Sequence, residues 1–122
     1  MSARILVIED NEQNMYLIHF LLEANGHTVI EALDGEEGIQ RAQDASPDII
    51  LLDIQLPKMD GYEIARIIRG TPGLATIPII AVTSYAMAGD REKILAAGAT
   101  DYIEKPINPA TFVEQIQKYF PV

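Results

Sequence analysis

Short runs of apolar residues recur along this chain, and the segments between them carry apolar residues at helical spacing. The strand-like runs occupy residues 4–8, 28–32, 48–53, 79–83 and 102–104. The third run is apolar without interruption over residues 49–52, which is typical of a central strand covered on both faces. The pattern therefore predicts five strands that alternate with five helices.

The segments between the strands predict helices with one apolar face each. Their expected spans are residues 12–24, a segment after Asp34, residues 62–69, residues 90–97 and a segment that begins at Pro109. Asn11 and Asp34 are expected N-terminal caps, and Gly26 and Gly98 are expected stops. The residues expected to face inward are Met15, Ile18, Leu21, Leu22, Gly38, Ile39, Ala42, Ile64, Ile67, Ile68, Phe112, Val113, Ile116 and Phe120.

Strict alternation of strands and helices predicts the α/β fold class. The expected architecture is a doubly wound parallel sheet of five strands in the order 2-1-3-4-5, with five helices on its two faces, the flavodoxin-like arrangement. A chain of 122 residues without an internal repeat or linker is long enough for one core and too short for two. We therefore expect a single domain over residues 1–122.

Composition narrows the functional classes. A net charge of −9 argues against nucleic acid as a partner, because phosphate backbones would be repelled. No apolar run approaches the roughly 20 residues that span a bilayer, so no membrane partner is expected. The absence of cysteine excludes disulfides and thiolate metal sites and fits a cytoplasmic protein.

Polar residues end four of the five apolar runs. Glu9 and Asp10 follow the first run, Asp53 ends the third, Thr83 ends the fourth and Lys105 follows the fifth. The carboxyl ends of parallel strands meet at one edge of a sheet, where ligands bind in this class of fold. The sequence therefore predicts a cluster of carboxylates with one hydroxyl and one ammonium group.

This cluster suits a divalent cation and a phosphoryl group. Mg²⁺ prefers oxygen ligands, which Glu9, Asp10, Asp53 and the backbone carbonyl of Gln55 would supply. The cation would relieve the repulsion between a carboxylate nucleophile and an anionic donor. Lys105 would offset charge on the transferred group, and a cis bond to the following proline would direct its ammonium toward the site.

With these residues in place, the chain resembles the receiver domain of two-component response regulators. The resemblance covers essentially the whole chain and joins the acidic pair, the acceptor aspartate, the hydroxyl and the Lys105-Pro106 pair in the family's order. The segment from Asp53 to Gly61, DIQLPKMDG, reproduces the family's acceptor loop. The resemblance implies that Asp53 is phosphorylated by the phosphohistidine of a histidine kinase or histidine phosphotransferase.

The resemblance also implies a role for each neighbour of Asp53. Together with Asp53 itself, Glu9, Asp10 and the Gln55 carbonyl would hold Mg²⁺. Thr83, Lys105 and the backbone amides of Ile54 and Ser84 would hold the phosphoryl group. The domain would catalyse its own phosphorylation and dephosphorylation without being an enzyme in the usual sense.

Two further features follow from the resemblance. Thr83 and Tyr102 would form a conformational switch that alters the face of the fourth helix, fifth strand and fifth helix. Gln55 and Tyr85 would tune the lifetime of the aspartyl phosphate, and the bulk of Tyr85 predicts a long one.

The family resemblance also predicts partners. With no effector domain after residue 122, we expect a stand-alone regulator, similar to single-domain receivers of the DivK type and also to receivers fused to hybrid kinases. Its target would bind the face that includes Tyr102, Glu104 and Ile107. The first helix, with Met15 and Tyr16 near its start, is the expected kinase-docking element.

Three other functions compete with this interpretation. A flavodoxin-type cofactor protein needs a neutral phosphate loop where Glu9 and Asp10 stand. A metal-dependent phosphatase with an aspartate nucleophile needs a second acid at the position of Gln55. A degenerate receiver that acts as a constitutive interaction module remains open, although no key position is missing.

Overall fold

The computed structural model describes residues 2–84 and 88–120 and shows one five-stranded parallel sheet. The strand order is β2-β1-β3-β4-β5, as predicted. The strands are β1 Arg4–Ile8, β2 Thr28–Ala32, β3 Ile49–Asp53, β4 Ile79–Thr83 and β5 Asp101–Glu104. The third strand begins one residue later than predicted, at Ile49, and the Asp48 carboxylate just before it accepts a hydrogen bond from the Arg4 amide.

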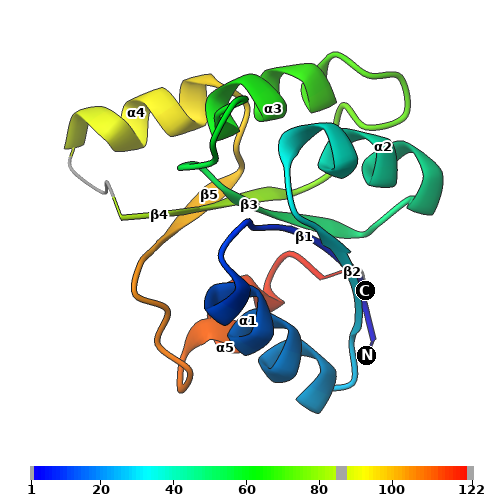
Figure 1. Ribbon diagram of the computed structural model, residues 1–122, viewed down its shortest axis with the longest axis vertical. Helices are drawn as coiled ribbons and strands as arrows, with labels where there is room; N and C mark the ends of the chain where they lie inside the picture. Colours follow the sequence, from blue (N-terminus) through cyan, green and yellow to red (C-terminus); the bar gives the residue numbers. More distant parts are fainter. Residues whose placement is uncertain (1, 85–87, 121–122) are drawn as a thin grey trace.

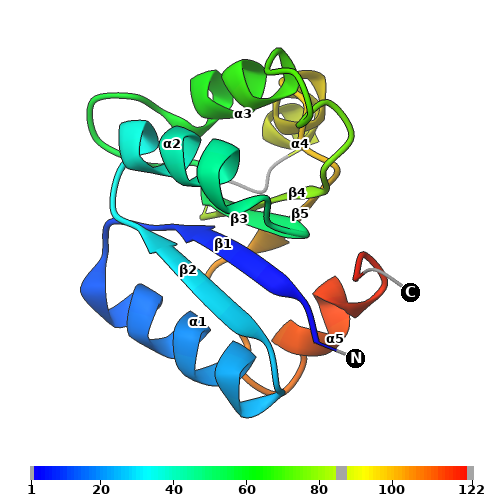
Figure 2. The same cartoon turned by 90° about the vertical axis from the view of Figure 1, so that its right-hand side faces the viewer.

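Helices cover both faces of the sheet. The helices are α1 Glu12–Ala24, α2 Gly35–Ala45, α3 Gly61–Arg69, α4 Ala88–Ala96 and α5 Phe112–Gln117. Figures 1 and 2 show α2, α3 and α4 on one side of the sheet and α1 and α5 on the other. No helix within residues 2–84 and 88–120 is both long and apolar enough to cross a bilayer.

Two separate cores result from the alternation of side chains along each strand. In β1, Leu6 and Ile8 enter the core beneath α2, α3 and α4, whereas Ile5 and Val7 enter the core beneath α1 and α5. All five side chains of β3 are buried, which confirms the prediction of a central strand. Both faces of the sheet are therefore covered by packed side chains, and the carboxyl edge is the part of the sheet that can bind ligands.

Side-chain caps fix the helix starts that follow this edge. Asn11, Asp34 and Asp60 each accept a hydrogen bond from the backbone amide three residues later, at 2.9, 2.8 and 3.0 Å. Gly26 has a φ of +85° just after α1, as expected of a glycine stop. The caps confirm the predicted starts of α1 and α2 and place the loops after β1, β2 and β3.

Two predictions about the helices were wrong. The last helix begins at Phe112 rather than Pro109, because the Asn108 side chain accepts from the Ala110 amide and holds a turn there. Ile67 is 38% exposed instead of inward. The buried face of α3 also contains Ala65, and Ile67 lies two residues, or about 200° of rotation, away from it.

Candidate functional site

Three carboxylates meet at the carboxyl edge of the sheet. Glu9 and Asp10 follow β1, Asp53 ends the adjacent β3, and one oxygen of each lies within 4.8 Å of the others. Glu9 and Asp53 are only 1% and 3% exposed, whereas Asp10 is exposed. The register between β1 and β3 pairs Ile8 with Leu52, which brings the following acidic residues side by side.

Lys105 enters this cluster from the loop after β5. Its Nζ lies 3.2 Å from Asp53 Oδ1 and 3.5 Å from Glu9 Oε1. The Lys105 amide donates to the Thr83 carbonyl at 2.8 Å, and the peptide bond to Pro106 is cis, as expected. One ammonium group thus faces two buried carboxylates.

Glu9 is the least satisfied of these groups. Its Oε2 accepts a hydrogen bond from the Asn11 amide at 3.2 Å, but the buried Oε1 has no hydrogen-bond partner among residues 2–84 and 88–120. Burial and the neighbouring Asp53 carboxylate raise the pKa of Glu9 to about 7, and Lys105 offsets only part of this effect. Oε1 thus has the Lys105 ammonium 3.5 Å away but accepts no hydrogen bond among the described residues, and a buried carboxylate oxygen in this state is a position where a further cation would be stabilised.

The loop after β3 holds Asp53 in place. The Gln55 amide donates to Asp53 Oδ1 at 2.9 Å. The Ile54 amide, predicted to face the phosphoryl group, instead donates to the Val82 carbonyl at 3.1 Å, because it continues the ladder between β3 and β4. A Cβ on Gly61 would lie 2.5 Å from Ile54 Cα, so only glycine lets α3 begin this close to the loop.

The hydroxyl and amide predicted for the phosphoryl group lie at the end of β4. Thr83 is fully buried and follows Val82, the register partner of Asp53. Ser84 is exposed, and its amide donates to Gln55 Oε1 at 3.0 Å. No local sequence pattern indicates this contact, because it joins two residues that are 29 positions apart in the chain.

The structure describes the predicted switch residue Tyr102 but not the predicted lifetime residue Tyr85. Tyr102 is half-buried against the core beneath α2, α3 and α4, and the Arg91 guanidinium carbon lies 5.6 Å from its ring centre. Tyr85 lies outside the described residues. Ile107, expected on the partner-binding face, is instead buried in the core beneath α1 and α5, so Tyr102 and the exposed Glu104 remain on that face.

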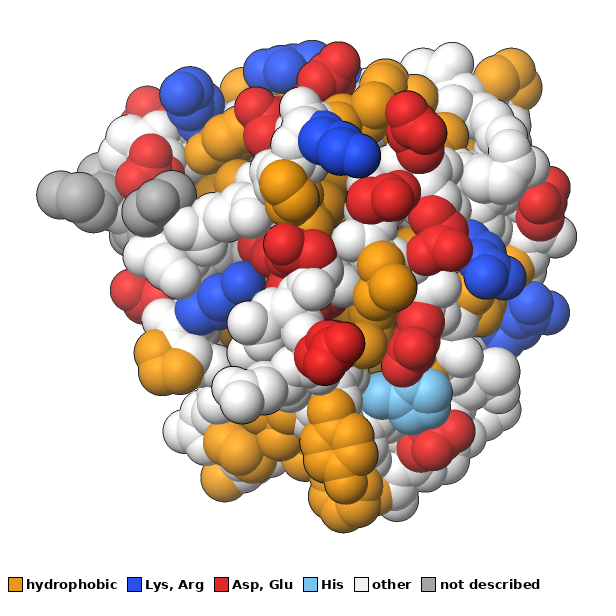
Figure 3. Space-filling model, in the orientation of Figure 1, with side chains coloured by type: hydrophobic (Ala, Val, Ile, Leu, Met, Phe, Trp, Pro, Cys, Tyr) orange, Lys and Arg blue, Asp and Glu red, His pale blue; other side chains and the backbone are white. Residues whose placement is uncertain are grey.

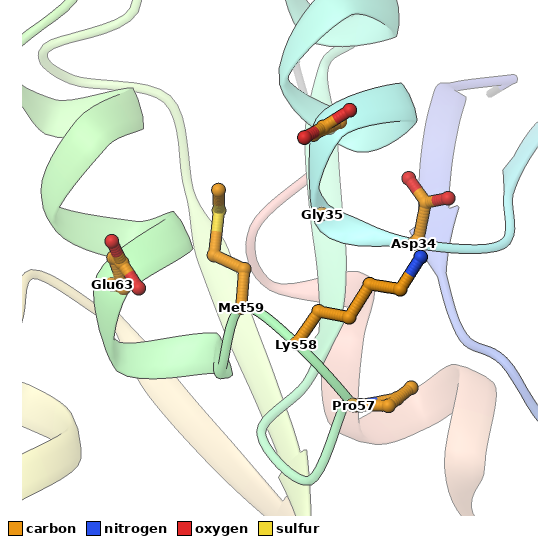
Figure 4. Close-up of a pocket in the computed structure, with 7 residues that line it drawn as sticks. Asp34, Gly35, Pro57, Lys58, Met59 and Glu63 are labelled. Atoms are coloured by element: carbon orange, nitrogen blue, oxygen red, sulfur yellow. The ribbon is translucent and has the colours of Figure 1, made fainter.

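Two surface features flank the acidic cluster. A hollow of about 300 Å³ lies between the start of α2 and the loop after β3. Figure 4 shows the Lys58 side chain in this region extending toward Asp34. On α1, Met15 is buried, whereas Tyr16 and Phe20 are 73% and 58% exposed. Their rings stack with centroids 6.5 Å apart, and Figure 3 shows apolar, acidic and histidine side chains together over this helix.

Comparison with known proteins gives consistent matches over nearly the whole chain. Residues 5–117 match the response regulator receiver domain family. The polar-differentiation response regulators DivK of Brucella ovis and Brucella anthropi are each 42% identical over 119 residues, which cover 98% of this chain and 97% of theirs.

Solved structures agree with these matches. The receiver domain of the sensor histidine kinase PA1611 from Pseudomonas aeruginosa, described with a magnesium ion coordinated in its active site cleft, is 37% identical, with a TM-score of 0.89 and 98% of each chain covered. The chemotaxis protein CheY4 of Vibrio cholerae is 28% identical, with a TM-score of 0.93 and coverage of 98% of this chain and 100% of that one.

Proposed function

Because the chain belongs to the response regulator receiver domain family of two-component systems, we propose that Asp53 is its phosphoacceptor. The observation that carries this proposal is a buried aspartate at a carboxyl strand end, with an ammonium group 3.2 Å away and two further carboxylates beside it. The phosphoryl donor is the phosphohistidine of a histidine kinase or histidine phosphotransferase.

The transfer needs little more than position and charge. A carboxylate oxygen of Asp53 attacks phosphorus, the N–P bond of the phosphohistidine breaks, and the imidazole leaves with the bonding pair. The Gln55 amide and Lys105 Nζ both contact Asp53 Oδ1, which fixes the position of this oxygen before the donor arrives. The Thr83 hydroxyl, the Ser84 amide and the Lys105 ammonium then hold the phosphoryl oxygens.

The acidic residues fit Mg²⁺. Glu9 Oε1 is a buried oxygen without a hydrogen-bond partner among the described residues, and the three carboxylates are the hard oxygen ligands that Mg²⁺ prefers. Glu9, Asp10, Asp53 and the Gln55 carbonyl would hold the ion. When bound, Mg²⁺ offsets the negative charge that otherwise repels the donor.

The same site would reverse the modification. Water attacks the phosphorus of the aspartyl phosphate, and the bond between phosphorus and the Asp53 oxygen breaks. The products are inorganic phosphate and the Asp53 carboxylate. The side chains of Gln55 and Tyr85 would limit the access of this water and so set the lifetime.

Phosphorylation of Asp53 would change the surface that a target protein binds. Thr83 would move toward the phosphoryl group, and Tyr102 would then reorient on the face of α4, β5 and α5, where a target protein binds. The exposed Tyr16–Phe20 stack on α1 supplies an apolar contact for the donor. A receiver domain of this kind acts through its partners.

Intact-mass measurement after incubation with acetyl phosphate tests the proposal. Wild type and Asp53→Ala are compared in Mg²⁺ and in EDTA, with Asp44→Ala as a control that removes an exposed aspartate from α2. We expect one phosphoryl adduct on wild type and Asp44→Ala in Mg²⁺, and none on Asp53→Ala or in EDTA. No adduct on wild type, even with a phosphohistidine donor, would favour the constitutive interaction module.

A further inference from the structure

The side chain of Gln55 bridges two loops of the site. Its Oε1 accepts a hydrogen bond from the Ser84 amide at 3.0 Å, so the loop after β3 is tied to the loop after β4. Its own backbone amide donates to Asp53 Oδ1 at 2.9 Å. The same residue therefore contacts the acceptor carboxylate through its backbone and, through its side chain, the Ser84 amide that is proposed to hold the phosphoryl group.

These contacts create a competition at the Ser84 amide. An N–H group makes one good hydrogen bond, and the Gln55 carbonyl oxygen already uses it. A phosphoryl oxygen on Asp53 would need the same donor. A charge-assisted hydrogen bond is roughly twice as strong as a neutral one, so the phosphoryl group would displace the amide oxygen.

We propose that Gln55 is a positioning residue that holds the Ser84 amide before phosphorylation and must release it when the phosphoryl group binds. This inference rests on the proposed function and adds that one residue of the site opposes binding of the phosphoryl group. The carboxamide acts as a neutral substitute for a phosphoryl oxygen. It keeps the loop after β4 close to Asp53, and it reduces the affinity of the site for the phosphoryl group.

Gln55→Met tests the bridge with little change of side-chain volume, because methionine has no strong acceptor. Gln55→Asn keeps the carboxamide but is one methylene too short to span the two loops. Both variants retain the backbone carbonyl and amide of residue 55. Gln40→Met is the matched control, since Gln40 lies on α2 and bonds only to Asp44 among the described contacts.

Two measurements are needed. The first is amide hydrogen exchange at Ser84 in the unphosphorylated protein. The second is the affinity for beryllium fluoride, a phosphoryl mimic that needs no phosphoryl donor, measured in the presence of Mg²⁺. We expect Gln55→Met and Gln55→Asn to lose exchange protection at Ser84. We also expect both to bind beryllium fluoride about threefold to tenfold more tightly, the ratio that one net hydrogen bond contributes.

A merely steric role for Gln55 predicts a different result. In that case the shorter side chain of Gln55→Asn would change the rates of phosphorylation and hydrolysis without changing Ser84 exchange. That result would overturn the proposal, as would an unchanged affinity for beryllium fluoride. If wild type fails to bind beryllium fluoride at all, the proposed function fails and the competition fails with it. Ser84 exchange would still report the bridge, so the two failures are distinguishable.

Discussion

The two ends of the same sheet are built in opposite ways. At the amino end, Arg69 donates to the carbonyls of Gly98 at 2.8 Å and Ile77 at 2.6 Å, and to Thr100 Oγ1 at 3.2 Å. At the carboxyl end, Lys105 faces two buried carboxylates, and Glu9 Oε1 lacks a hydrogen bond among the described residues.

The difference teaches where stability and function reside. Each guanidinium contact at the amino end satisfies a backbone carbonyl or a hydroxyl, so that end needs nothing further. The carboxyl end brings carboxylates of like charge together in a buried place, which costs free energy until a cation offsets their charge. Changes at the first end should affect folding, and changes at the second should affect chemistry.

Lys105→Met should give the largest effect on chemistry. The variant loses the ammonium group that holds Asp53 and offsets phosphoryl charge, so we expect the rate of adduct formation from acetyl phosphate to fall about a hundredfold. The rate is measured by intact mass in saturating Mg²⁺. Lys118→Met, which removes an exposed lysine paired with Asp101, should keep the wild-type rate. A Lys105→Met rate within a factor of three of wild type would break the comparison.

Arg69→Met should show the reverse behaviour. Loss of the guanidinium leaves the Gly98 and Ile77 carbonyls without this donor, so we expect the free energy of unfolding in urea to fall by about 2 kcal/mol. Adduct formation at Asp53 should be unchanged in the folded variant. Arg66→Met, an exposed position on the same helix, should be near neutral. An unchanged unfolding free energy for Arg69→Met would show that the amino end is not a stability element.

The smallest effect concerns the two ion pairs that His19 makes with Glu23 and Glu31. Burial lowers the pKa of His19, but hydrogen bonds to Glu31 on β2 and Glu23 on α1 outweigh it and raise the pKa above its usual value. The ion pairs therefore stabilise the fold fully below pH 6.5, and this contribution is lost as pH rises through the folded pKa. Exposed pairs contribute about 0.2–1 kcal/mol.

His19→Asn tests that sign. The difference in unfolding free energy between wild type and variant should be largest at pH 5.5 and shrink at pH 9. Because the difference cancels titrations elsewhere, a gap that stays constant over this range would mean that His19 does not act through its charge.

Strands and the acidic cluster could be predicted because both follow from local rules. Apolar runs such as residues 79–83 fix a buried strand, and the parallel topology then brings Asp10, Asp53 and Lys105 to one edge. The chemistry predicted for the cluster rests on its residue types and stays a prediction. The predicted family membership of the chain is confirmed by the match over residues 5–117.

The failures concern contacts between distant segments. The exposure of Ile67 and the burial of Ile107 depend on how neighbouring elements pack, which periodicity does not specify. The Gln55–Ser84 and Arg69–Gly98 hydrogen bonds join residues 29 positions apart, and their geometry exists only in the assembled fold. The raised pKa of Glu9 likewise requires the burial that the sheet edge creates.

The central claim is that the carboxyl end is destabilised by its own charges until a cation binds. Urea unfolding of wild type and Asp53→Asn, in EDTA and in Mg²⁺ at pH 8, tests it most directly. We predict that Asp53→Asn is at least as stable as wild type in EDTA, because Glu9 loses its charged neighbour, and that Mg²⁺ stabilises wild type more than the variant. A variant clearly less stable than wild type in EDTA, with equal stabilisation of both by Mg²⁺, would contradict the account.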